Sequence, residues 1–155
     1  QGATGDPLPA SEALAGIKPV ATVKVAVVGA HLSGMQLNGK LTERGATMIS
    51  QTETAPHYKF VALPGTAPPK PGLLRVDNGT GSAIKVEVWA MPVAKYGSFV
   101  ALIPSPLGIG TLQLADGSSV QGFICEPQAL VGAQDITHFG GWRAYIASLQ
   151  SGRTT

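Results

Sequence analysis

The 155-residue sequence contains few charged side chains, a single cysteine and no long apolar run. Charged residues make up 13% of the chain and hydrophobic residues 44%, which excludes the charged, apolar-poor composition of a disordered protein. The net charge is only +2 and the 11 Lys and Arg residues are scattered, so we expect no nucleic-acid partner. Every apolar segment is shorter than the roughly 18 residues of a membrane span, so we expect no membrane partner either.

Several kinds of chemistry lack the residues they need. The one cysteine, Cys125, lies in an apolar run that favours a buried side chain over a reactive thiol, and a single cysteine is typical of a cytoplasmic protein. The three histidines, His31, His57 and His138, stand far apart in the sequence, so we predict no metal and no cofactor. The chain also lacks both a Gly-x-Ser-x-Gly elbow and the Ser–Ser–Lys signature of amidases.

The length fits one domain with a core of its own. Residues 1–21 are small, polar and proline-containing, which predicts a linker remnant from a preceding domain. The domain itself is expected over residues 22–150, with a polar tail at 151–155.

Apolar periodicity predicts an α+β fold: a small, mostly antiparallel sheet with flanking helices, in which the strand starting at Val23 is central. The turn at Asp116-Gly117 predicts a hairpin, and Gly45 and Pro104 are expected to end helices. Strands are predicted over residues 23–28, 47–54, 58–63, 73–77, 83–91, 111–115 and 119–125, and helices over 37–44, 92–103 and 135–149.

A histidine in a strand–loop–helix setting is the main candidate for chemistry. His31 lies in the loop Gly29–Gly34, directly after a buried strand and before a predicted helix. Histidine exchanges protons near neutral pH, and a helix amino terminus offers N–H groups to an anion. The alternative is a histidine that only hydrogen-bonds the turn.

Four long segments resemble the carboxy-terminal domain of allophanate hydrolases and of the related urea amidolyases. They are VAVVGAHLSGMQLNGKLTERGA, TAPHYKFVALPGTAPPKPGLLRV, VEVWAMPVAKYGSFVALIPSPLGIGTLQLADGSSVQGFICE and DITHFGGWRAYIAS, and together they cover residues 23–148. Gln36 departs from the proline expected in HLSGMPLN. The resemblance implies a γ-glutamyl cyclotransferase-like fold, which is a small β-barrel with flanking helices. True cyclotransferases carry an acid near residues 100–104, where this chain has no carboxylate, so we expect no cyclotransferase activity.

The resemblance also implies a reaction and a partner. An amidase domain, fused or separate, would release ammonia from allophanate in urea or s-triazine nitrogen catabolism. The present domain would then decarboxylate the product, N-carboxycarbamate, with His31 as the general acid. Two substrate carboxylates need cations or N–H donors, for which Arg75, Lys59 and Lys70 are candidates. The neutral candidates for substrate binding are Ser33, Gly34, Asn38 and Tyr58.

Alternatives to these roles come from the same residues. Each lysine could be a solvated surface charge, and Glu87 could either orient a cation or form a cross-strand ion pair. The competing hypothesis for the whole domain is a non-catalytic module for homodimerisation or assembly. The low charge density of the chain is compatible with an interface, and so are Trp89 and Tyr145, which we expect to be exposed.

Overall fold

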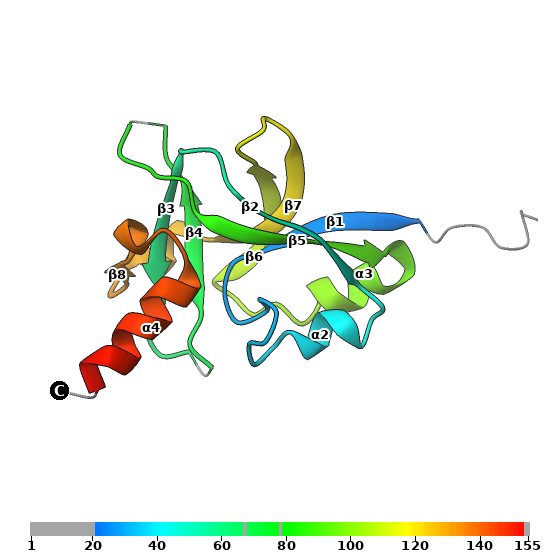
Figure 1. Ribbon diagram of the computed structural model, residues 1–155, viewed down its shortest axis with the longest axis horizontal. Helices are drawn as coiled ribbons and strands as arrows, with labels where there is room; N and C mark the ends of the chain where they lie inside the picture. The colour runs from blue at the N-terminus through cyan, green and yellow to red at the C-terminus, as the bar shows by residue number, and fades with distance from the viewer. Residues whose placement is uncertain (1–20, 67, 78, 154–155) are drawn as a thin grey trace, which may run out of the picture.

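The computed structural model describes residues 21–66, 68–77 and 79–153, so nearly all of the predicted linker lies outside the described residues. Strands and short helices follow one another along this part of the chain (Figure 1). In chain order the elements are β1 (Thr22–Val27), α2 (Gly39–Thr42), β2 (Thr47–Glu53), β3 (Tyr58–Ala62), β4 (Pro71–Arg75), β5 (Lys85–Pro92), α3 (Val93–Val100), β6 (Leu107–Gln113), β7 (Ser119–Cys125), η1 (Pro127–Leu130), β8 (Gln134–Asp135), η2 (Thr137–Phe139) and α4 (Trp142–Arg153).

The larger sheet has five strands in the order β2-β5-β1-β7-β6. Its middle strand, β1, pairs antiparallel with β5 and parallel with β7, so that Val25 lies opposite Trp89 on one side and Gln121 on the other. The last residues of β1 are completely buried, as expected for a β-branched, apolar strand with neighbours on both edges. The predicted central position of this strand is confirmed.

The hairpin predicted at Asp116-Gly117 is also confirmed, because β6 and β7 pair antiparallel on either side of it. Gly117 has a φ of 90°, a left-handed conformation that glycine adopts without steric cost. The second sheet has three strands in the order β4-β3-β8. The two sheets approach closely where Gly72 meets Cys125, since a Cβ at Gly72 would come within 2.8 Å of Sγ. The α+β class is confirmed, whereas a closed barrel is not.

All three predicted helices are shorter than expected. The helix predicted over residues 92–103 is α3, which ends at Val100, before Pro104. The helix predicted from residue 37 is only the four-residue α2, preceded by turns. The helix predicted from residue 135 begins at Trp142, because Gly140 has a left-handed φ of 73° that ends the preceding η2. Glycine is also a poor helix former, so Gly140 and Gly141 favour a break at this point. The predicted tail at 151–155 begins inside α4, which continues to Arg153.

Residues that were predicted to lie on a polar strand face or at an interface are buried in the structure. In β5, Lys85 is exposed, but Glu87 and Trp89 on the same predicted polar face are only 3% and 6% exposed. Tyr145 is also buried, at 8% exposed, because its ring packs on Trp142 and Phe139. The prediction that Trp89 and Tyr145 are exposed is therefore wrong.

Cys125 is buried as predicted, and burial raises the pKa of its thiol.

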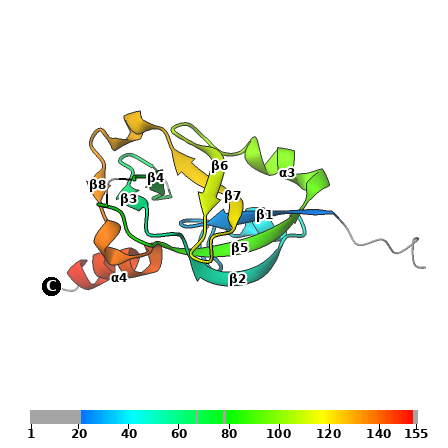
Figure 2. The same cartoon turned by 90° about the horizontal axis from the view of Figure 1, so that it is seen from above.

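In both views α4 lies with β3 at one end of the molecule, while α3 lies at the other end (Figures 1 and 2). None of the helices in the described residues is both long and apolar enough to cross a bilayer.

Candidate functional site

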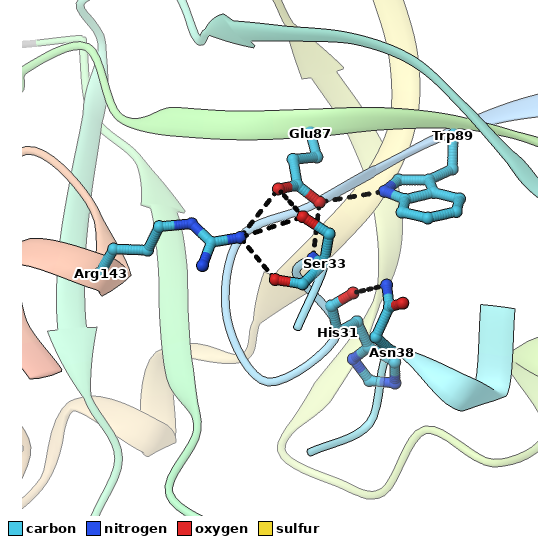
Figure 3. Close-up of polar contacts among 6 residues, drawn as sticks. All are labelled: His31, Ser33, Asn38, Glu87, Trp89 and Arg143. Atoms are coloured by element: carbon cyan, nitrogen blue, oxygen red, sulfur yellow. Dashed lines mark hydrogen bonds and ion pairs between the residues drawn. The ribbon is translucent and has the colours of Figure 1, made fainter. Parts of the chain in front are cut away.

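The loop between β1 and α2 carries His31, and two hydrogen bonds close it on itself. The Leu37 N–H donates to the Ala30 carbonyl at 2.8 Å, and the Asn38 side-chain amide donates to the His31 carbonyl at 2.9 Å. Asn38 is therefore engaged with the backbone of His31, as Figure 3 shows. The sequence places a histidine between a buried strand and a helical turn, and these bonds give it a defined position.

The imidazole of His31 forms part of the wall of a small pocket. Its ring lies 5.5 Å from the ring of Phe99, edge-on, and 4.9 Å from that of Phe123. The pocket has a volume of about 270 Å³. Besides His31 it is lined by two cations, Lys40 and Lys70, and by Val28, Gly29, Ala30, Leu37, Pro68, Pro71, Leu102, Ile103, Pro104, Leu107 and Phe123. Among the described residues, no Asp or Glu lines it.

The electrostatics of this pocket disfavour further positive charge. Burial lowers the pKa of His31, and the charges of Lys70 and Lys40 lower it further, to about 4. The imidazole is therefore neutral at pH 7 when the pocket holds no anion. Lys40 and Lys70 both lower the pKa of His31. Their combined positive charge attracts a negatively charged ligand.

The depressed pKa of His31 predicts a specific dependence of stability on pH. In the unfolded chain His31 takes up a proton near pH 6.5, but in the folded chain only near pH 4, so the unfolded state binds more protons in between. His31 should therefore lower the free energy of unfolding by about 3 kcal/mol as the pH falls from 7 to 4. Urea unfolding of wild type and His31→Asn at both pH values measures this difference. Equal losses in the two proteins would contradict it.

A second polar cluster lies on the other side of the loop and centres on Glu87 (Figure 3). Its carboxylate accepts hydrogen bonds from Ser33 N at 2.8 Å, Ser33 Oγ at 2.9 Å and Trp89 Nε1 at 3.2 Å. Arg143 in α4 forms an ion pair with it at 3.0 Å. Burial by itself would raise the pKa of Glu87, but the hydrogen bonds outweigh it and the pKa is lowered. Glu87 is thus an ionised, buried acid, and its ion-pair partner is Arg143 of helix α4 instead of a residue of a neighbouring strand.

The remaining predicted site residues lie in other places. Gly34, with a φ of 81°, borders a shallow surface hollow beside Arg143. The buried Tyr58 hydroxyl accepts a hydrogen bond from the backbone N–H of Gln113 at 3.0 Å.

Two of the three predicted cations are also elsewhere. Arg75 is exposed and pairs with Asp77 at 3.2 Å, and Lys59 lies opposite Leu74 in the β3–β4 pair. Of the predicted set, the structure therefore brings only His31 and Lys70 into one pocket.

Sequence reasoning missed two residues of these clusters. Lys40 follows the loop directly and could have been found from its place in the predicted helix beside His31. Arg143 is 110 residues from Ser33, and no local pattern signals that contact. Within residues 21–66, 68–77 and 79–153, no three His, Cys, Asp or Glu side chains are placed to hold a metal ion.

The fold and the pocket define an α+β domain with a small basic cavity suited to an anion. The model of the family "Allophanate hydrolase C-terminal domain" matches residues 23–147. The chain belongs to this family, and the mixed sheets with few helices agree with the γ-glutamyl cyclotransferase-like fold that the sequence resemblance implies.

Some known proteins with similar sequences and structures are much longer than this chain, whereas another has nearly the same length as the matched part. It is 44% identical over 137 residues to the urea amidolyase of Lachancea kluyveri, an alignment that covers 86% of this chain and 8% of that protein. A crystal structure of Kluyveromyces lactis allophanate hydrolase superposes with a TM-score of 0.80 at 46% identity, covering 83% of this chain and 21% of the other. The Escherichia coli protein c4763 superposes with a TM-score of 0.75 at 32% identity, covering 81% and 96% of the two chains.

Proposed function

We propose that the His31 pocket binds a small dicarboxylate and that the domain decarboxylates N-carboxycarbamate within an allophanate hydrolase. The observation that carries this proposal is the composition of the pocket: two lysines and a histidine, with no lining carboxylate among the described residues, in an otherwise apolar cavity of about 270 Å³. A cavity of this size suits a compact ligand, and the lysines favour an anion.

The charges of pocket and ligand complement each other. Burial is the main cause of the low pKa of His31, and a dianion bound near Lys40 and Lys70 would offset the further lowering that comes from their charges. Binding of the dianion would therefore raise the pKa of His31 towards neutrality, because a nearby negative charge favours the imidazolium. The histidine then becomes able to hold and transfer a proton in the presence of substrate.

The reaction needs one proton. N-carboxycarbamate carries two carboxylates on one nitrogen, and protonation of that nitrogen makes it a better leaving group. Cleavage of one C–N bond then releases carbon dioxide and leaves carbamate, with the bonding electron pair staying on nitrogen. In this proposal His31 delivers the proton and the lysines hold the carboxylates.

The urea amidolyases that this chain matches support the proposal, because the matched segment lies within a much longer chain in each. The chain spans 8% of the length of the urea amidolyases it matches. The amidase domain, fused or separate, would supply the substrate. The competing role in homodimerisation or assembly loses the support expected from Trp89 and Tyr145, since both rings are buried.

Binding of malonate, a stable dianion with two carboxylates on one central atom, tests the pocket directly. Replacing Lys40 or Lys70 by Met should weaken malonate binding about tenfold each, the usual effect of losing one charge-assisted hydrogen bond. Lys59→Met is the matched control, because Lys59 lies outside the pocket. Calorimetric titration gives the dissociation constants. Absence of malonate binding by wild type, or equal weakening in the Lys59 variant, would refute the proposal.

A further inference from the structure

We propose that Glu87 is a positioning residue that holds the loop after β1 in place, and with it the imidazole of His31. This inference rests on the proposed function, because it assigns a role to the support of the same pocket. Glu87 itself lies on the far side of the loop from the pocket and does not line it.

The first step of the argument is the double contact of Glu87 with one residue. Its Oε1 accepts the Ser33 backbone N–H at 2.8 Å, and its Oε2 accepts the Ser33 hydroxyl at 2.9 Å. Two bonds from one carboxylate fix both the backbone and the side chain of Ser33. Ser33 is two positions after His31, so the orientation of the loop at the histidine depends on this anchor.

The second step is that the anchor is rigid. Glu87 lies opposite Val27, the last residue of β1, so it sits on a paired strand directly beside the start of the loop. Trp89 Nε1 donates to Oε1 at 3.2 Å from the same strand. A carboxylate oriented from two directions keeps its position better than one on a free side chain.

The third step is that α4 closes the same cluster. The Arg143 guanidinium donates through one nitrogen to the Ser33 carbonyl at 2.7 Å, to Ser33 Oγ at 3.2 Å and to Glu87 Oε2 at 3.0 Å. Figure 3 shows Arg143 reaching Ser33 from the helix while the His31 ring points away from Glu87. The loop is thus held on one face by Glu87 and Arg143 and presents His31 on the other.

The fourth step concerns why an acid should occupy this place. A buried charge stabilises a fold little compared with apolar residues that fill the same space, whereas it can specify one local arrangement. Glu87 is 3% exposed. It accepts two hydrogen bonds from Ser33 and one from Arg143, which also binds Ser33. Its partners are therefore Ser33, in the loop whose conformation the pocket needs, together with Arg143 of α4 and Trp89 of β5.

Three variants and a control test this role. Glu87→Gln replaces one acceptor oxygen by an amide, Ser33→Ala removes the hydroxyl alone, and Ser33→Thr keeps it. The control is Glu53→Gln, an exposed acid that lines the outer cavity beside Glu87. The readouts are the pKa of His31 from NMR titration of its imidazole, the affinity for malonate, and the thermal midpoint.

A positioning role predicts changes that a purely structural role would not produce. In Glu87→Gln and Ser33→Ala the loosened loop should hydrate His31, so its pKa should rise from about 4 towards 6.5. Malonate affinity should fall about tenfold, the scale of one lost charged hydrogen bond. Ser33→Thr and Glu53→Gln should match wild type in both respects. These differences are measured at a temperature where every variant is folded.

The outcomes separate the two proposals. If His31 keeps its pKa near 4 and malonate affinity is unchanged in both Glu87→Gln and Ser33→Ala, Glu87 is not a positioning residue. If wild type does not bind malonate but the His31 pKa rises in these variants, the positioning of the loop stands and the proposed ligand fails. If a lower thermal midpoint is the only effect, Glu87 is structural and the inference is overturned.

Discussion

Replacing His31 by Asn should slow carbon dioxide release from N-carboxycarbamate about 100-fold or more, while ammonia release by a matching amidase domain continues. The expected size is that of losing a positioned general acid. The fold should survive, because His31 lies in a loop and its ring is only partly buried. Asn retains hydrogen-bonding ability but cannot deliver a proton.

A coupled assay measures this effect. The amidase domain is supplied with allophanate, and ammonia and carbon dioxide are followed together with wild type, with His31→Asn and without the present domain. His57→Asn is the control, since His57 does not line the pocket. Carbon dioxide release as fast as wild type would show that His31 is not the acid. An unchanged rate without the whole domain would defeat the decarboxylase proposal and favour the assembly role.

Truncating Phe99 to Ala should cost about 3–5 kcal/mol in the free energy of unfolding, the range for removing a buried aromatic side chain. Phe99 is 1% exposed on α3, and its ring lies 5.8 Å from that of Phe123 and 5.5 Å from that of His31. The cavity left behind would border the imidazole. The same change should therefore raise the pKa of His31 by admitting water beside it.

Urea denaturation at pH 7 measures the loss. Val93→Ala is the matched control, because Val93 lies on the same helix but is 51% exposed, and its truncation should change stability by less than about 0.5 kcal/mol. A loss below about 1 kcal/mol for Phe99→Ala would mean that α3 does not pack against the wall of the pocket as described.

The parts of the fold that could be predicted are those with strong local signals. The apolar stretch from Val23 indicated a central strand, and Asp116-Gly117 indicated a hairpin. Both features depend on residues that are adjacent in the sequence, so a local pattern is enough to predict them. The start of α4 was missed for a related reason. Apolar spacing continued back to Ile136, but the left-handed Gly140 interrupts the helix.

The candidate site was only partly accessible from sequence. His31 was found from its place after a buried strand, and Lys70 from its charge. The alternation in β5 suggested an outward-facing Glu87, yet Arg143 and Ser33 cover it from distant parts of the chain. Contacts between residues so far apart depend on tertiary packing, which a single sequence does not display.

The arrangement of the five-stranded sheet has a consequence for how the chain folds. Its middle strand is first in the described chain, but its parallel neighbour, β7, comes near the other end. During synthesis β1 can pair with β5 once the middle of the domain has emerged, but its other edge stays unpaired until β7 has been made near the end. Pairing of such distant strands costs conformational entropy for closing a long loop before any contacts form. This predicts slow folding for a domain of this size. The loop that carries His31 would acquire its shape only in the last stage of that process.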